Sequence, residues 1–169
     1  MERPNRPLGA PLLGHSLRQP GCRAQLGSRL FGYQILDSIN DLVKAQGYGP
    51  AAKIQSLFFF PPAYFNEHRQ QMTAFETALA ETNRPIHGYT NSTHACLVHD
   101  SLDRLPQVTC PTLVLAGGQD VLYAVCASQQ IADRVPDCTI KICEEASHFF
   151  LIQCFEESMQ DIEDFLQRN

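Results

Sequence analysis

Hydrophobic residues in the carboxyl-terminal part of the chain follow a strand, helix, strand pattern. Residues 112–116 form a short apolar run bounded by a proline and by two glycines, which predicts a fully buried strand. Residues 127–134 carry apolar side chains at helical spacing, and residues 139–143 are rich in β-branched residues. This order predicts two parallel strands joined by a right-handed helical crossover.

Helical spacing dominates the residues before this unit. Apolar residues recur at that spacing over 28–46, and Gly47 follows in the position of a C-cap glycine. Further helices are predicted over 50–60, 62–79 and 89–98.

A last helix is predicted from Cys154 to Gln167. One face is apolar and consists of Phe155, Met159, Ile162, Phe165 and Leu166, while acidic residues lie opposite. Such an amphipathic helix is expected to pack its apolar face on the sheet and to leave its acidic face in solvent.

Two residues with catalytic chemistry follow the predicted strands. Asp120 lies just past the carboxyl end of the first strand, and His148 comes after the second. In open parallel sheets, ligands and catalytic groups gather beyond the strand carboxyl ends. A structural interpretation stays open for each residue, since an Asp after Gly-Gly is commonly a turn former or N-cap and a His before two Phe residues is commonly part of a core.

These residues carry a resemblance to a known family. Residues 104–120 (RLPQVTCPTLVLAGGQD) and Ala146-Ser-His148, with Asp120 and His148 separated by 28 positions, resemble the last third of the α/β-hydrolase fold. In that family a Ser nucleophile, an acid and a His follow in this chain order. The resemblance implies that Asp120 is the acid, that His148 is the base, that residues 28–105 form a helical lid, and that the substrate is a small ester, lactone or amide.

The only visible nucleophile candidate is Ser16. The segment Gly14-His-Ser16-Leu-Arg18 resembles the nucleophile elbow Gly-x-Ser-x-Gly, but Arg18 replaces the last glycine and nearby prolines interrupt the flanking strand and helix. In one interpretation Ser16 is the nucleophile and an internal deletion has removed its scaffold. In the other, the motif lies without a scaffold in the segment 1–27, whose four Pro and four Gly predict an irregular or disordered leader.

Chain length limits how much of the family fold is present. The 169 residues, 44% hydrophobic and 18% charged, fit one globular domain, whereas a complete hydrolase of this fold usually needs roughly 250 residues. The expected architecture is a partial α/β-hydrolase fold: a leader (1–27), a helical lid (28–105) and a terminal β-α-β-α unit of the core (106–169). Most of the amino-terminal core, including the loop that supplies an oxyanion-hole donor, is expected to be missing.

This shortening leaves activity open and suggests an alternative. The alternative is a truncated, non-catalytic remnant that acts as a self-association module, because the 112–116 strand would keep an unpaired apolar edge. We expect the chain to form homo-oligomers through that edge or to be poorly stable alone.

Composition excludes several other classes. A net charge of −5 with 13 Lys and Arg residues gives no basic stripe for nucleic acid, and no apolar run approaches ~18 residues, so no membrane span or signal peptide is expected. Seven cysteines without a Cys-x-x-Cys pair predict reduced, mostly buried thiols in a cytoplasmic protein rather than a disulfide framework or zinc site. No pattern indicates a cofactor.

Two further clusters have structural and functional interpretations. The aromatic residues from Phe58 to Phe60, with Tyr64 and Phe65, are expected to form lid core more than an apolar substrate pocket. His94 and His99 are five residues apart, which does not place both rings on one helical face, so a structural role is favoured over metal binding.

Overall fold

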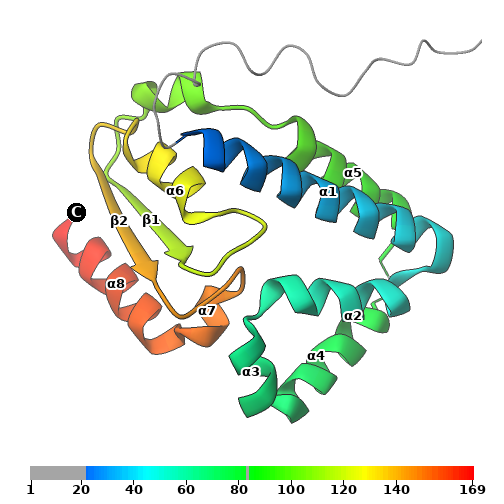
Figure 1. Ribbon diagram of the computed structural model, residues 1–169. Coiled ribbons are helices and arrows are strands. Elements are labelled where there is room, and N and C mark those ends of the chain that lie inside the picture. The colour runs from blue at the N-terminus through cyan, green and yellow to red at the C-terminus, as the bar shows by residue number, and fades with distance from the viewer. Residues whose placement is uncertain (1–21, 83) are drawn as a thin grey trace, which may run out of the picture.

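The computed structural model describes the backbone of residues 22–82 and 84–169, and side-chain surroundings from residue 31 onward. Helices precede a small sheet, and two further helices follow it (Figure 1). In chain order the elements are α1 (Cys22–Gln46), α2 (Tyr48–Phe59), α3 (Pro62–Glu67), α4 (Arg69–Ala80), α5 (Ile86–Val98), the 3₁₀ helix η1 (Leu102–Gln107), β1 (Thr112–Gly117), α6 (Val125–Ala132), β2 (Cys138–Cys143), α7 (Phe150–Gln153) and α8 (Phe155–Arg168).

The boundaries of α1 differ from expectation at one end only. The helix begins at Cys22, so six residues of the segment expected to be an irregular leader (1–27) belong to it. At the other end Gly47 terminates the helix as predicted. Its φ of 78° lies in the left-handed region that favours glycine, and its N–H donates to the carbonyl of Val43 at 2.9 Å.

The main apolar cluster joins the helices before β1 to the strand unit. Ile35, Ile39 and Val43 lie four residues apart along α1, so that they share one face, and they are buried together with Ala51 of α2. Leu122, from the loop after β1, completes the cluster. This contact ties α1 to the loop that follows Asp120.

The helix expected over 62–79 is two helices, with the break at His68. The backbone of His68 leaves the helical region (φ −122°, ψ 38°), and its ring lies against the ring of Tyr64 with centroids 4.1 Å apart. After the break, α4 runs back along α2 and packs against it. Tertiary packing therefore overrides a periodicity that continues through the break.

The sheet consists of two parallel strands, as the strand, helix, strand order predicts. Register pairs Thr112 with Cys138 and continues to Gly117 with Cys143, and α6 forms the crossover. The prediction of a fully buried first strand is wrong: residues 112–115 are half-buried, and only Ala116 and Gly117 are buried. Within the described residues β1 pairs with β2 alone, so its other edge forms no strand pair there.

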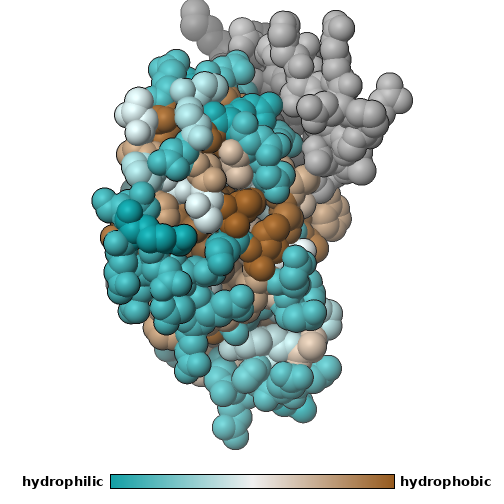
Figure 2. All heavy atoms as spheres, turned by 90° about the vertical axis from the view of Figure 1, so that its left-hand side faces the viewer, coloured by the Kyte–Doolittle hydropathy of each residue, from teal (hydrophilic) through white to brown (hydrophobic). Residues whose placement is uncertain are grey.

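Helix α8 does not turn its whole apolar stripe to the sheet. Phe155 and Leu166 are 61% and 67% exposed, whereas Ser158 is buried and Asp161 forms an ion pair with Lys141 of β2 at 2.9 Å. Two strands offer the helix a narrow surface, so part of the stripe stays uncovered. Figure 2 views this side of the molecule and shows hydrophobic residues among hydrophilic ones at the surface.

The cysteines also depart from expectation. Cys143 and Cys154 form a disulfide, so the prediction that all the cysteines are reduced is wrong for this pair. Cys96 and Cys110 are free but exposed, not buried. The sequence offered no local signal for the disulfide, because its partners lie on different elements 11 residues apart.

No helix in the described part of the chain is both long enough and apolar enough to cross a membrane.

Candidate active site

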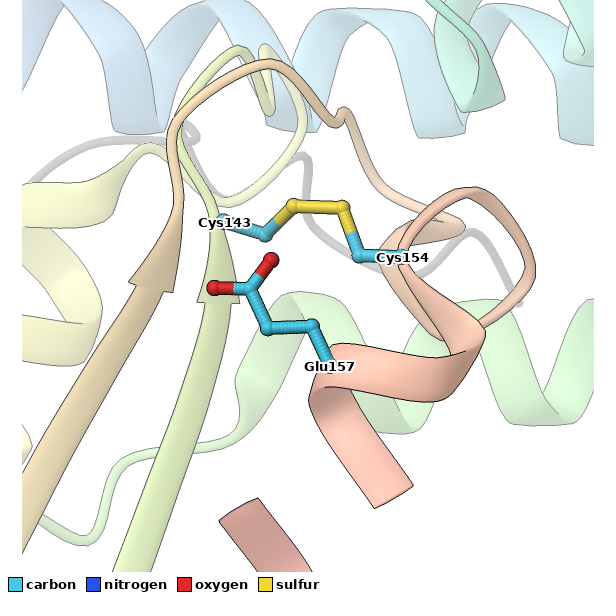
Figure 3. Close-up of side chains that lie close together, drawn as sticks. All are labelled: Cys143, Cys154 and Glu157. Atoms are coloured by element: carbon cyan, nitrogen blue, oxygen red, sulfur yellow. A yellow bond between two sulfur atoms is a disulfide. The ribbon is translucent and has the colours of Figure 1, made fainter. Parts of the chain in front are cut away.

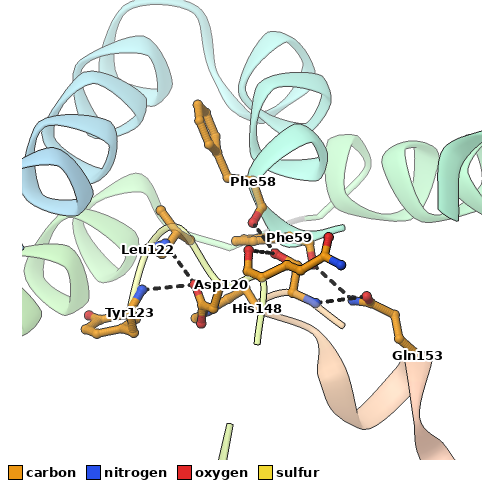
Figure 4. A network of polar contacts seen from close by, with 9 residues as sticks. Phe58, Phe59, Asp120, Leu122, Tyr123, His148 and Gln153 are labelled. Carbon is orange, nitrogen blue, oxygen red and sulfur yellow. Dashed lines mark hydrogen bonds and ion pairs between the residues drawn. The ribbon is translucent and has the colours of Figure 1, made fainter. Parts of the chain in front are cut away.

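Asp120 and His148 lie in two loops at the carboxyl edge of the sheet. The loop after β1 carries Asp120, and the loop after β2 carries His148 (Figure 4). Backbone hydrogen bonds connect these loops: the N–H of Gly118 donates to the carbonyl of Cys143, and that of Gln119 to the carbonyl of Ala146, each at 2.8 Å. Parallel pairing of the two strands thus brings both side chains to one place.

The carboxylate of Asp120 uses its two oxygens for different purposes. Oδ1 accepts hydrogen bonds from the backbone N–H groups of Leu122 and Tyr123, at 2.8 and 2.9 Å. Oδ2 lies 2.9 Å from Nδ1 of His148. The Asp120 side chain is only 8% exposed and the His148 side chain 28%. Because Oδ1 is held by two backbone donors, Oδ2 has a defined direction toward the imidazole ring.

Aromatic rings hold the imidazole of His148 in place. Phe59, at the end of α2, lies 5.3 Å from it between centroids, with the two planes inclined by 27°. Tyr123 and Phe149 each lie 5.8 Å away and also stack. The ring is therefore restricted to one orientation, with Nδ1 toward Asp120. Within the described residues, Nε2 has no hydrogen-bond partner and remains the nitrogen that can accept a proton.

Ser147 and Gln153 attach the His148 loop to the end of α2. The hydroxyl of Ser147 lies 3.3 Å from the carbonyl oxygen of Phe58 and 3.2 Å from that of Gln119. Gln153 Oε1 accepts from the N–H of Ser147 at 3.0 Å, while its Nε2 donates to the carbonyl of Phe59 at 3.2 Å. The end of α2 therefore forms one side of the site.

Sequence reasoning missed Ser147, Gln153 and the position of Phe59. Gln153 is the only polar residue of α7, which was the available signal for its role. The aromatic run containing Phe59 was expected to be lid core, and Phe60 is indeed 2% exposed. Phe59 instead contacts the imidazole ring of His148, an arrangement that depends on how the lid folds back.

The other candidates from the sequence lie elsewhere. Ser16 falls outside the described residues. His99 contacts Ser101 through Nε2 at 3.1 Å. The group of possible metal ligands found in the described part of the chain consists of Cys143, Cys154 and Glu157 and contains neither His94 nor His99.

One cavity among the described residues lies in the helical part of the chain that precedes β1. It has a volume of about 220 Å³ and lies between α1 and α2, lined mainly by apolar side chains that include Ile39, Ile54 and Phe58. Neither Asp120 nor His148 lines it. The Phe58 side chain points into the lid, while its carbonyl lies beside Ser147, so this cavity is separate from the imidazole.

Tyr123 titrates abnormally and provides a test of the site's packing. Burial, then the neighbouring Cys96, and more weakly Tyr33 and Asp120, raise its pKa from 10.0 to about 12. As the pH rises, the hydroxyl of Tyr123 loses its proton in the unfolded chain before it does so in the folded chain. Its contribution to the free energy of unfolding is therefore complete below pH 10 and is lost as the pH rises toward 12. We expect Tyr123→Phe to flatten the fall of melting temperature over this window, measured by circular dichroism. An identical alkaline fall in the variant and the wild type would contradict the assignment.

The arrangement has the parts of an acid–base pair. A buried carboxylate that accepts from Nδ1–H holds the imidazole in the tautomer whose Nε2 is unprotonated, and it stabilises the imidazolium that forms when Nε2 takes a proton. The pair acts on whatever hydroxyl or water is brought to Nε2.

Known proteins resemble this chain both in sequence and in structure. No family model matches the chain. RutD of Stutzerimonas stutzeri, which carries the name of a carbamate hydrolase, is 27% identical over 121 residues, covering 70% of this chain and 43% of that protein. The 3-oxoadipate enol-lactonase 2 of Acinetobacter baylyi is 27% identical over 107 residues, covering 63% and 39%. The chain spans less than half the length of the curated relatives it matches.

Solved structures give the same result for the fold. The enol-lactonase from Burkholderia xenovorans LB400 superimposes with a TM-score of 0.72 at 17% identity, over 79% of this chain and 50% of that one. A thermophilic esterase from Thermogutta terrifontis gives 0.69 at 21% identity, over 81% and 50%. The expected fold class, a partial α/β-hydrolase fold, is confirmed by these likenesses. With the curated relatives, they show that this chain belongs to the α/β-hydrolase family and matches about half of the fold of its members.

Proposed function

We propose that this chain provides the acid and the base of a serine hydrolase that acts on a small ester, lactone or amide. The observation that carries the proposal is the 2.9 Å contact between His148 Nδ1 and Asp120 Oδ2, with Oδ1 of the same carboxylate held by two backbone N–H groups. The names of the relatives, which include an enol-lactonase and an esterase, support this substrate class.

The proposed reaction uses His148 twice. Nε2 first takes the proton of a serine hydroxyl while the serine oxygen attacks the carbonyl carbon of the substrate. The imidazolium, stabilised by Asp120, then gives this proton to the leaving group as the acyl–enzyme forms. A water molecule repeats the sequence: Nε2 takes its proton, the hydroxide oxygen attacks the acyl carbon, and the serine oxygen leaves with the proton returned from His148.

The nucleophile we propose is Ser16, which lies outside the described residues. A fluorophosphonate probe reacts covalently with an activated serine and provides the test on the full chain. Ser16→Ala is expected to abolish labelling, whereas Ser92→Ala, at an exposed position of α5, is expected to leave it unchanged. Labelling that persists in Ser16→Ala would assign the nucleophile to another serine, and no labelling of the wild-type chain would reject the activity for this chain.

Self-association is the second candidate function, favoured by the edge of β1 that pairs with no strand in the described residues. The N–H groups of Thr112 and Gly118 point to the β2 side, where they donate to Asp137 and Cys143. Because successive N–H groups alternate in direction, those of residues 113, 115 and 117 point to the unpaired edge. Such donors, on an apolar strand, bind a further strand. Sedimentation at micromolar concentration is expected to give oligomers, and a compact, stable monomer would reject this function.

We propose a cytoplasmic location, supported by the exposed free thiols of Cys96 and Cys110, since free thiols persist in reducing compartments; the Cys143–Cys154 disulfide is evidence against it. Cell fractionation tests the location, and recovery from an oxidising compartment would reject it.

A further inference from the structure

The disulfide between Cys143 and Cys154 lies next to the proposed base. Cys143 is the last residue of β2, and Cys154 separates α7 from α8 (Figure 3). The bond closes the loop that carries His148, which lies five residues after the first cysteine and six before the second. No other covalent link between side chains is found in the described residues.

The disulfide acts at the base of the loop, whereas hydrogen bonds hold its tip. Ser147 and Phe149 contact the end of α2, the latter through its N–H to the carbonyl of Phe59 at 3.1 Å. At the base, the N–H of Ala146 donates to the carbonyl of Cys143 at 3.2 Å. Without the bond, the distance between the end of β2 and the start of α8 depends on noncovalent contacts, which include the ion pair between Lys141 of β2 and Asp161 of α8.

We propose that Cys143 and Cys154 are a reversible thiol–disulfide pair that positions His148 against Asp120, so that the oxidised chain holds the competent pair and reduction loosens it. This inference rests on the proposed hydrolase function. It makes the two cysteines positioning residues, because they touch neither the substrate nor the reacting atoms.

The oxidant required is a low-molecular-weight disulfide such as oxidised glutathione. The thiolate of one cysteine attacks one sulfur of that disulfide, which forms a mixed disulfide and releases one thiol. The second cysteine, as its thiolate, then attacks the mixed disulfide, which forms the Cys143–Cys154 bond and releases the second thiol. Two protein thiols are oxidised, one small disulfide is reduced to two thiols, and the reverse exchange reduces the protein.

The surroundings of the pair are compatible with exchange. Both cysteines are only half-buried, so the pair does not lie in the closed core. The exposed carboxylate of Glu157, from the first turn of α8, lies within 4.8 Å of them. A closed tetrahedral zinc site has four protein ligands, whereas the two thiols and the carboxylate of Glu157 supply three.

The test titrates the full chain through glutathione buffers from reducing to oxidising. Alkylation with mass spectrometry measures the disulfide, ¹⁵N NMR of the His148 ring measures its tautomer and order, and fluorophosphonate labelling measures the active serine. We expect the labelling rate to fall on the order of 10²-fold on reduction, the loss associated with a misplacement of about 1 Å. Cys154→Ser is expected to show the reduced rate in every buffer, and Cys110→Ser, which removes an exposed free thiol, to follow the wild type.

Each outcome decides the proposal. A disulfide that forms and breaks without changing the His148 spectrum or the labelling rate would overturn it, as would a pair that stays reduced under oxidising buffer or retains a zinc ion in native mass spectrometry. If no serine is labelled in any buffer, the hydrolase function fails, while the His148 spectrum still tests the positioning role. Cys143→Ser serves as a second variant if Cys154→Ser does not melt cooperatively.

Discussion

Asp120→Asn is expected to lower the rate of fluorophosphonate labelling, and of ester hydrolysis, by about 10⁴-fold while leaving the fold intact. The amide oxygen of Asn keeps the place of Oδ1, where it accepts from the N–H groups of Leu122 and Tyr123. The amide NH₂ then faces Nδ1 of His148, in place of Oδ2. Nδ1 must accept this hydrogen bond, so the ring proton moves to Nε2, which can no longer act as a base.

NMR separates this cause from a loss of structure. The ¹⁵N shifts of His148 are expected to report a protonated Nδ1 in the wild type and a protonated Nε2 in Asp120→Asn. Asp133→Asn is the matched control, since its carboxylate at the end of α6 accepts from the side chain of Gln129 in α6 and, among the described residues, makes no contact with His148. Equal activity in Asp120→Asn and the wild type, or an unchanged tautomer, would contradict the role of Asp120.

Gly117→Ala is expected to destabilise the chain by about 3 kcal/mol, the upper part of the usual range for overpacking. Gly117 ends β1, where the backbone of the His148 loop crosses it. A Cβ there would lie 2.7 Å from the carbonyl oxygen of Ala146, and closer still to that of Ser147. These are backbone atoms tied into the sheet and the lid, so they cannot rotate away. The melting temperature is expected to fall by roughly 6–12 °C.

Gly49→Ala provides the control for this substitution. Gly49 lies in the first turn of α2, and a Cβ there meets nothing within 4 Å. We expect Gly49→Ala to leave the melting temperature unchanged or to raise it. Alanine lowers the conformational entropy of the unfolded chain, which stabilises the folded chain by up to about 1 kcal/mol. If Gly117→Ala melts like Gly49→Ala, the close approach between β1 and the His148 loop is not present in solution.

The two substitutions test different layers of the same site. Asp120→Asn changes which proton the imidazole holds and leaves the backbone where it is, so activity falls without a loss of stability. Gly117→Ala pushes the His148 loop away from β1, so activity and stability fall together. The lid contributes to this positioning through the carbonyls of Phe58 and Phe59, which contact Ser147 and Gln153.

Much of the fold was predictable from local patterns. The strand, helix, strand order and the parallel pairing follow from short apolar runs and a crossover helix, and the end of α1 follows from Gly47. These features depend on residues close together in sequence. The placement of Asp120 and His148 in loops at one edge of the sheet follows as well, because both come directly after parallel strands.

Contacts between distant segments were not predictable in this way. Ser147 and the carbonyl of Phe58 are 89 residues apart, and Gln153 and that of Phe59 are 94 apart. The hydrophobic periodicity of the sequence does not indicate which carbonyl at the end of α2 faces which loop. The same holds for the break at His68, which depends on α4 packing against α2, and for the disulfide, which depends on where α7 returns Cys154.

The sequence by itself determined the order of the elements and the identity of the acid–base candidates, because apolar periodicity and the position after a strand end are local properties. The tertiary structure alone decided the direction of the imidazole, the aromatic stack on Phe59, the covalent closure of its loop and the exposure of the apolar stripe on α8. These depend on which surfaces meet when the helices fold back over two strands, and such meetings are set by shape and packing across the whole molecule.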